Sequence, residues 1–518
     1  MELSVRLFLE SAPKRQRYLR AAHILFGFSE SGKFSPETRR QLLSAAVGYL
    51  KNGLSVYDIQ LFRRSCEEHS DWLPEDLMVY EEEEAAVGAR AEVALQSALS
   101  CLERLHVEDG VGKSNSNRLL AMKRGRLEST ELRGLRDQMR VAEVYADIRN
   151  YEAMSKAVNR LLALAHSMQQ TAAISNRADS VFVQLEVNRR IVELWLGVGN
   201  LDAVRSLVGT STATLMTQAA ECLMQIQFCS PSRLVPQQRT VEDLISELEE
   251  YALFFSIVRG LCMFEDQNFS GFARVFTGSG LRGAGWIPAV VEVNTKRNSL
   301  QVPASLGGDV NASGRSSVIH HLRHIVEVSI TSGPQLGVMV LFSAIAALPR
   351  AEAMILITRV DIMSLWEDVS DAHVLVQAFQ LAKWGEFFRA ASVLTSLFLK
   401  TDIFAHKHSD LLYRLVIQSV VLGYANAFMR LELRKAAAKL SIPLGELQEI
   451  LQELILEGRL QARMDFVSQV LTNARFNRIT DGYSPQSLVL LDCICRSEMA
   501  MADVEQSLRI LSLHRHHA

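Results

Sequence analysis

Two histidines separated by one residue, His406 and His408 in the segment HKHSD, are the first place in this sequence to look for metal chemistry. Imidazole nitrogens are good zinc ligands, and a catalytic zinc ion takes three protein ligands and keeps one open position. Zinc hydrolases that use this pair take the third ligand from an aspartate about ten residues later. Gln418 occupies that position, within the apolar stretch LVIQSVV, so the sequence does not complete a zinc site here.

A second pair, His320 and His324, is spaced so that both imidazoles share one face of a helix. Two histidines alone are too few ligands for a metal site, and a solvated helix face is the favoured interpretation. The seven cysteines are scattered, odd in number and without a C-x-x-C pair. That usage predicts reduced, buried thiols, with neither a disulfide framework nor a zinc site.

A glycine-rich segment, GSGLRGAG from Gly278 to Gly285, contains the spacing G-x-G-x-x-G of dinucleotide-binding loops. Such a loop binds a pyrophosphate only where a helix begins at its last glycines and offers backbone N–H groups. Here WIPAVVEVN follows, with a proline and strand-forming residues, so a simple loop is predicted. No cofactor is expected, and no arrangement of nucleophile and base indicates that this chain is an enzyme.

Composition places the chain among globular proteins, with 518 residues, 48% of them hydrophobic and 22% charged, and a formal net charge of −3. Proteins that grip polyphosphate normally carry a basic excess, which is missing here. MELSVRLFLESAPKR is unlike a secretory signal, and the longest apolar run, Leu336 to Leu348, is shorter than the ~18 residues of a membrane span. We therefore expect a soluble protein of the cytoplasm and nucleus that does not contact a membrane.

Hydrophobic periodicity predicts a mainly α chain. The segments VAEVYADIRNYEAMSKAV (Val141–Val158) and IVELWLGVGNLDAVRSLV (Ile191–Val208) align with each other, each as a helix, a tight turn at an asparagine and a second helix. The pattern recurs loosely around Asn268 and around Gly385. Since one such hairpin cannot bury its apolar face alone, the repeats predict a TPR-like solenoid of stacked helical hairpins.

Changes in composition divide the chain further. We expect an N-terminal helical region over 1–105, a polar linker from Gly110 to Ser129, and the repeat region over 130–403 with a flexible insertion at 277–317. One small residue in each repeat is expected to let the paired helices approach closely: Ala153, Ala203, Ala273 and Ala390.

The segment AAAKLSIPLGELQEILQELILEGRLQARMD (Ala436–Asp465) predicts a short helix, a turn containing proline, a longer helix and the start of a strand. This order is typical of a winged helix, and we assign 404–475 to that fold. In a DNA-reading winged helix the exposed side of the longer helix meets the duplex. Here that helix carries four carboxylates on the side away from its leucines, which phosphate would repel: Glu446, Glu449, Glu453 and Glu457.

Protein binding is therefore the favoured role of the winged helix, with the strands as its natural place. LQARMD and SQVLTNA are predicted to form a small wing whose edge offers unpaired N–H and C=O groups to a neighbouring strand. The expected interface comprises Leu460, Ala462, Met464, Val470 and Leu471. A last amphipathic helix is predicted over 484–513, with one apolar face formed by Leu488, Leu491, Cys495, Met499 and Ala502.

Helical hairpins that run directly into a winged helix resemble the PCI domain. The resemblance is carried by LLYRLVIQSVVLGYANAFMRLELRKAAAKLSIPLGELQEILQELILEGRLQARMDFVSQVL (Leu411–Leu471). PCI proteins are scaffold subunits of the proteasome lid, the COP9 signalosome and a translation initiation complex. Within this family, LILEGRLQARMD (Leu454–Asp465) and the N-terminal helices in Arg17–Glu68 are most similar to signalosome members.

What the resemblance implies is a non-catalytic role. PCI subunits join through the edges of their winged helices, and their C-terminal helices form a common bundle, which is the place the resemblance gives to the apolar face of 484–513. A signalosome subunit would bind other PCI subunits and the isopeptidase subunit, which removes a ubiquitin-like modifier from cullin-RING ubiquitin ligases (deneddylation). Contact with the ligases would then be indirect.

Three alternatives remain open. A scaffold subunit of the proteasome regulatory-particle lid would have the same fold in a different complex. A nucleic-acid-binding regulator would need a basic patch assembled from dispersed residues: Lys123, Arg124, Arg126, Arg430, Arg434 and Lys435. A catalytic isopeptidase would need the zinc ligand that the sequence lacks after His408.

Overall fold

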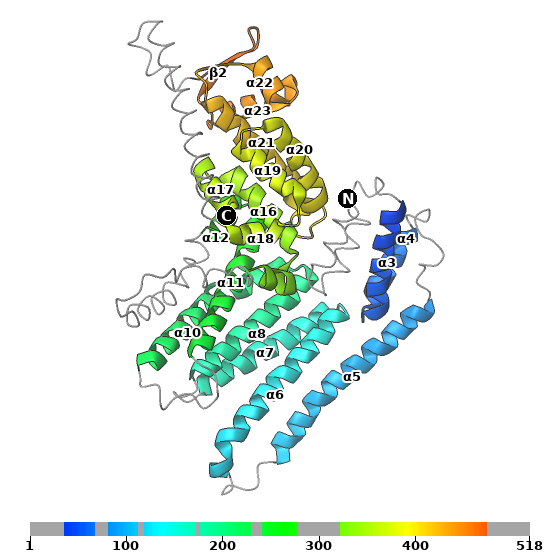
Figure 1. Ribbon diagram of the computed structural model, residues 1–518. Coiled ribbons are helices and arrows are strands. Elements are labelled where there is room, and N and C mark those ends of the chain that lie inside the picture. Colours follow the sequence, from blue (N-terminus) through cyan, green and yellow to red (C-terminus); the bar gives the residue numbers. More distant parts are fainter. Residues whose placement is uncertain are drawn as a thin grey trace. The chain divides into compact units, whose positions relative to one another are not determined.

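The computed structural model describes residues 36–67, 81–111, 119–171, 177–228, 241–277 and 322–473, which form helices and one small sheet near their end (Figure 1). A mainly α fold, with a helical region before a winged helix, is confirmed. The chain divides into two compact units. The first reaches Ala344 and includes Ile355–Val369 and Thr395–Ser409, while the second contains Ile345–Met354, Ser370–Leu394 and the chain from Asp410 onward.

The first unit opens with α3 (Pro36–Asn52), α4 (Val56–Glu67) and the long helix α5 (Glu81–Val111). The acidic run at 81–84 forms the first turn of α5, where negative charge is favourable next to the positive end of the helix dipole. Two of its carboxylates also hold the neighbouring helices, since Glu83 pairs with Lys51 of α3 at 2.5 Å and Glu84 with Arg63 of α4 at 3.1 Å.

The polar linker expected from Gly110 to Ser129 is wrong over most of its length. Helix α6 begins at Leu119 and continues to Asp147, so the residues from Leu119 to Ser129 are helical. Leucine, methionine, lysine, arginine and glutamate favour helices, and the single Gly125 costs only about 1 kcal/mol against that preference. The turn residues Gly, Ser and Asn are concentrated before Leu119.

Helices α6, α7 (Tyr151–Thr171) and α8 (Arg177–Val198) run side by side (Figure 1). They continue into α9 (Leu201–Val208), α10 (Thr210–Phe228), α11 (Val241–Glu265) and α12 (Phe269–Val275). The hairpins predicted around Asn150, Asn200 and Asn268 are confirmed as the α6–α7, α8–α9 and α11–α12 pairs.

One turn is used in all three hairpins. The residue before the asparagine has a left-handed backbone: Arg149 at φ 61°, Gly199 at φ 77° and Gln267 at φ 59°. The asparagine N–H then donates back to the carbonyl five residues earlier, as Asn200 does to Trp195 at 3.0 Å, which closes the end of the first helix. Gly199 is the residue type that adopts this conformation without strain.

The same asparagine also begins the next helix. Its side-chain Oδ1 accepts from the backbone N–H three residues later, at Ala153 (3.1 Å), Ala203 (3.0 Å) and Gly271 (2.9 Å). Ala153 and Ala203 are only half-buried, so their role is to donate the backbone N–H group of this capping hydrogen bond. The close approach expected of the small residues applies to Ala273 and Ala390, which are fully buried.

The rest of the first unit is tightly packed. Phe264 on α11 contacts Phe269 and Phe272 of α12 with ring centroids 5.2 and 5.1 Å apart. A Cβ at Gly337 would lie 2.8 Å from Cδ1 of Trp366, so only glycine allows this approach.

From Leu322 onward the described chain forms η8 (Val326–Ile330), α16 (Gly333–Ala347), α17 (Arg350–Ile357), α18 (Val360–Trp366), η9 (Thr395–Leu399) and η10 (His406–His408).

No single helix among the described residues is long and apolar enough to cross a membrane. Leu322–Ile330 and Gly333–Ala347 reach that length and composition only when taken together, and they meet at a bend of 110°. The residues of α16 from Gly333 to Ile345 are all buried within the protein.

The second unit contains the hairpin α19 (Ser370–Gln380) and α20 (Trp384–Leu394), helix α21 (Ser409–Asn426) and the winged helix. The fourth predicted repeat, around Gly385, is this hairpin, and Ala382 at φ 53° takes the left-handed position in its turn. Arg350 stacks over Phe379 and Trp384 at 5.4 and 5.7 Å from the ring centroids.

The asparagine caps yield a first prediction. Replacing Asn200→Ala should destabilise the α8–α9 turn by about 1 kcal/mol, because the amide of Ala203 loses its acceptor. Hydrogen exchange of peptides covering 195–208 should then accelerate by roughly fivefold. Asn159→Ala, at an exposed position inside α7, is the control and should leave exchange unchanged. Equal effects of the two substitutions would refute the capping role.

Candidate protein interface on the winged helix

The winged helix is built from β1 (Arg430–Glu432), α22 (Leu433–Leu440), α23 (Leu444–Leu456), β2 (Ala462–Asp465) and β3 (Val470–Asn473). Helix α22 is capped by Ser441, which has a left-handed backbone (φ 56°) and whose N–H group donates to two carbonyls of the last turn. Pro443 is the residue before α23. A Cβ at Gly385 of α20 would lie 2.8 Å from the Ser441 hydroxyl, so the hairpin and the winged helix are in close contact.

The sheet has the order β1-β3-β2, with both pairings antiparallel. Strands β2 and β3 were predicted, whereas β1 was not. Its three residues lie between helical segments and only Leu431 is buried, so no alternation is long enough to reveal a strand. The unpredicted strand places β3 in the centre, because β1 pairs with one side of β3 and β2 with the other, so β1 and β2 are the two outer strands.

The predicted interface residues separate into two groups. Ala462 and Met464 lie on the edge strand β2 and are half-buried. Leu460, Val470 and Leu471 are 1%, 8% and 1% exposed, and the last two belong to the central strand. The backbone of that strand is already paired on both sides. These three residues therefore form the core behind the edge, and the interface prediction is narrowed to β2.

The hairpin that joins β2 to β3 is held by one carboxylate. Asp465 Oδ1 accepts from the N–H groups of Val467 (2.9 Å) and Ser468 (3.3 Å), and Oδ2 accepts from the Ser468 hydroxyl (2.5 Å). These hydrogen bonds favour the charged form, so the pKa of Asp465 lies below its ordinary value of 3.8.

This ordered tip presents two apolar side chains to solvent. Phe466 is 56% exposed and Val467 96% exposed. Turns of this kind are usually polar. A rigid turn with adjacent exposed apolar residues beside a free strand edge is typical of a surface that binds protein.

Helix α23 differs from prediction at one glutamate. Glu446, Glu449 and Glu457 are exposed, as expected of a face that would repel DNA. Glu453 instead turns towards α21, where it pairs with Arg414 and accepts from the Gln418 amide at 3.1 Å. Gln418, at the position of the missing zinc ligand, thus has a structural role in the winged helix.

The dispersed cations of the nucleic-acid alternative do not belong to one unit. Lys123, Arg124 and Arg126 belong to α6 in the first unit, and the other three belong to the second. Two of those three already have partners, since Arg434 donates to Gln469 at 2.5 Å and Lys435 pairs with Glu432 at 2.9 Å.

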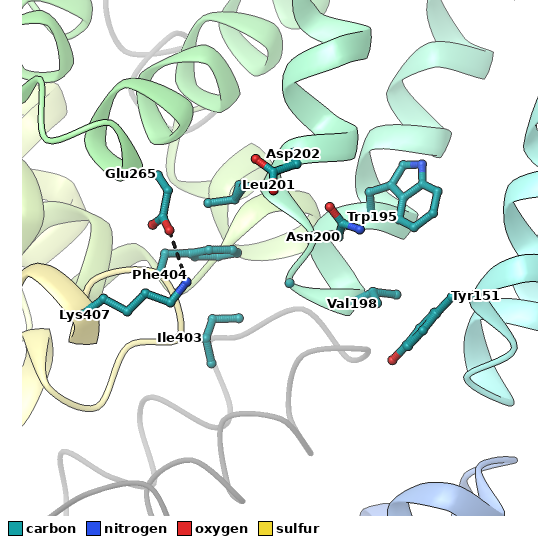
Figure 2. A pocket seen from close by; sticks show the side chains of 11 residues that line it. Tyr151, Trp195, Val198, Asn200, Leu201, Asp202, Glu265, Ile403, Phe404 and Lys407 are labelled. Atoms are coloured by element: carbon teal, nitrogen blue, oxygen red, sulfur yellow. Dashed lines mark hydrogen bonds and ion pairs between the residues drawn. The ribbon is translucent and has the colours of Figure 1, made fainter.

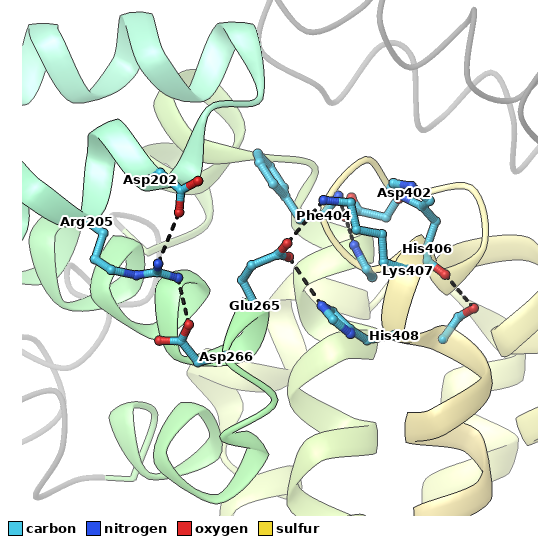
Figure 3. Close-up of polar contacts among 11 residues, drawn as sticks. Asp202, Arg205, Glu265, Asp266, Asp402, Phe404, His406, Lys407 and His408 are labelled. Carbon is cyan, nitrogen blue, oxygen red and sulfur yellow. Dashed lines mark hydrogen bonds and ion pairs between the residues drawn. The ribbon is translucent and has the colours of Figure 1, made fainter.

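The histidines of HKHSD hold a loop of the first unit (Figure 3). His408 Nε2 lies 3.4 Å from Glu265, whose other oxygen pairs with Lys407 at 3.1 Å. Asp402 accepts from the N–H groups of Phe404 (2.8 Å) and Ala405 (2.9 Å), which orders the preceding turn. Within the described ranges no three His, Cys, Asp or Glu side chains are grouped so that they could hold a metal ion.

Among the cysteines that the structure describes, Cys222 and Cys262 are buried thiols, as predicted, whereas Cys101 is a free thiol that is only half-buried. Burial raises the pKa of the Cys262 thiol to about 11, so its thiolate is scarce at neutral pH. Other predicted features lie outside the described residues. These are the GSGLRGAG segment, His320 and the C-terminal apolar face, Leu488, Leu491, Cys495, Met499 and Ala502.

Asp465 generates a prediction that depends on pH. A carboxylate whose folded pKa is depressed stabilises the tip above its ordinary pKa of 3.8, and this stability is lost as pH falls through the lower folded value. Protection of the Val467 and Ser468 amides from hydrogen exchange should therefore be constant at neutral pH and lost in strong acid. Asp465→Ala should remove it at every pH, whereas Arg463→Ala should not. Protection retained in Asp465→Ala would contradict the assignment.

Residues 390–473 match the family model of the PCI domain. The match begins in α20 and ends with β3, so it spans the end of the hairpin, α21 and the whole winged helix. No curated protein matches the chain.

Proposed function

We propose that this chain is a scaffold subunit of a complex built from PCI proteins and that the free edge of β2 joins it to a neighbouring subunit. The observation that carries the proposal is the PCI match over 390–473, together with a sheet order that leaves β2 outermost. PCI domains serve assembly with other PCI-containing subunits. A strand edge is suited to that role, because its N–H and C=O groups can pair with a strand of the partner.

The specific complex that we propose is the COP9 signalosome, with this chain in the position of subunit 1. The support is the similarity of Leu454–Asp465 and of Arg17–Glu68 to that subunit. In this role the chain organises the complex that removes the ubiquitin-like modifier from cullin-RING ligases, in the cytoplasm and nucleus. The isopeptidase belongs to another subunit, and the predicted helix over 484–513 contributes to the helical bundle of the complex.

Mass spectrometry of the proteins that co-purify with the tagged chain from its native cells, in mild salt, is the direct test. We expect other PCI subunits, the signalosome isopeptidase and cullins. Proteasome base ATPases and lid subunits would assign the chain to the lid instead. Nucleic acid alone, or no stable partner, would refute the scaffold role.

The β2 edge is tested by one substitution. Ala462→Pro should abolish co-purification of the neighbouring subunit, because proline removes the N–H group that donates to the Leu460 carbonyl at 3.1 Å and so disrupts the start of the edge strand. Ala462→Thr is the control and should retain the partner, since a β-branched residue preserves the strand. Circular dichroism should show unchanged helix content in both variants. Full assembly of the proline variant would show that β2 is not the interface.

A further inference from the structure

A hollow of about 500 Å³ lies in the first unit, and of its lining only Ile403, Phe404 and Lys407 fall within the PCI match (Figure 2). It forms where the α6–α7 turn, the α8–α9 turn, the end of α11 and the loop before η10 come together. Its chemistry is mixed, with apolar side chains on the walls and charged groups at the rim. No part of the proposed scaffold interface is included, so this site adds to that function.

The apolar wall is aromatic and continues onto a neighbouring helix. Trp195, Leu201 and Phe404 are 8%, 8% and 3% exposed, whereas Tyr151 is 41% exposed at the margin. Helix α4 is held next to this margin, because its Asp58 pairs at 2.9 Å with Arg149, two residues before Tyr151.

Tyr57 (58% exposed) and Leu61 (44%) follow one side of α4 at a spacing of four residues. The apolar strip thus extends beyond the hollow, and it is fixed in place. Arg149, in the α6–α7 turn, pairs with Asp58 of α4 at 2.9 Å, and these side chains are only 8% and 10% exposed.

The rim carries more negative than positive charge. Two carboxylates, Asp202 and Glu265, face one ammonium group, that of Lys407. The Asp202 side chain is 90% exposed and shares Arg205 with Asp266, at 3.1 and 2.7 Å (Figure 3). The three carboxylates Asp202, Glu265 and Asp266 thus have one more charge than Arg205 and Lys407 together, and an incoming cation is favoured over an anion.

An arginine side chain matches this combination. Its methylene stem packs on apolar walls, its planar guanidinium stacks on an exposed aromatic ring such as Tyr151, and its N–H fork binds a carboxylate such as Asp202. Lysine supplies the charge but not the planar fork. A volume of about 500 Å³ exceeds one side chain, so part of the adjoining peptide also fits.

We propose that this hollow binds a linear peptide segment of a partner protein, anchored by an arginine next to the rim carboxylate Asp202, with an apolar residue of the same segment on the Tyr57–Leu61 strip. The partner is recognised by sequence chemistry, arginine beside an apolar residue, and not by strand pairing. The site is separate from β2, so binding here does not depend on the PCI interface.

Photo-crosslinking in the full-length chain tests the proposal. The photoreactive residue p-benzoylphenylalanine replaces Tyr57, which belongs to the apolar strip of α4 and is already an exposed aromatic. The same residue at Leu164, 43% exposed on α7, is the control. After irradiation of the native assembly, we expect mass spectrometry to identify one segment of another protein with arginine within a few residues of an apolar side chain.

Two variants distinguish the rim charge from a general loss of salt bridges. Asp202→Lys and Asp266→Lys each remove one partner of Arg205, but only Asp202 lines the hollow. Crosslinking should fall at least fivefold in the first and stay unchanged in the second. A synthetic copy of the captured segment should bind the full chain at least tenfold more tightly than a copy with citrulline in place of arginine.

Several outcomes would overturn the proposal. These are crosslinking no stronger than from Leu164, crosslinks only to other residues of this chain, a captured segment without arginine, or equal effects of the two lysine variants. Because these outcomes concern only the hollow and the Tyr57–Leu61 strip, they leave the proposed scaffold role intact. Conversely, if the tests with Ala462→Pro contradict the scaffold role, the arginine-anchored segment would still be expected in the hollow.

Discussion

Helix ends impose the constraint on which the first unit depends. Each helix leaves backbone carbonyls unpaired at its end and N–H groups unpaired at its start, and both sets need partners within a short turn. In this chain a left-handed residue followed by an asparagine satisfies both, at Asn150, Asn200 and Asn268. Helices can then reverse direction within three residues, which places successive hairpins in contact so that each covers the apolar face of the next.

The same turns also create the hollow. The residues that directly follow two of the turn asparagines, Tyr151 and Leu201, form part of its lining, and loop residues from Ile403 to Lys407 close it (Figure 2). Its rim charges are held in ion pairs that connect distant parts of the sequence, such as Lys407 with Glu265. The asparagine turns that stabilise the repeats thereby place aromatic and acidic groups together where a partner can reach them.

In the second unit, the order of the strands determines which backbone groups remain available. With β3 in the centre, two strands pair with it and bury Val470 and Leu471, while the outer side of β2 remains an edge. Exposed strand edges are a risk of unspecific aggregation, and proteins usually cover or charge them. The combination of a free edge, a tip fixed by Asp465 and exposed Phe466 and Val467 is easiest to understand if another chain covers this surface in an assembly.

Sequence alone determined the features that depend on local chemistry. Helical periodicity predicted the mainly α fold, the asparagines predicted three of the hairpin turns, and the segment Ala436–Asp465 predicted the two helices of the winged helix, α22 and α23. The predicted linker is wrong over 119–129 because the Gly, Ser and Asn residues that indicated it lie mostly before Leu119, and the residues after it favour a helix. These signals are readable because they arise from neighbours three to five residues apart.

Tertiary structure decided everything that depends on distant neighbours. Only the pairing of β3 with both β1 and β2 shows that Val470 and Leu471 are central and that β2 is an outer strand. Only packing against α21 shows that Glu453 belongs to an ion pair and not to a free acidic face. The hollow combines Tyr151, Asp202 and Phe404, which no spacing in the sequence connects. Local preference specifies which elements form, but the contacts between elements specify which of their groups remain available to a partner.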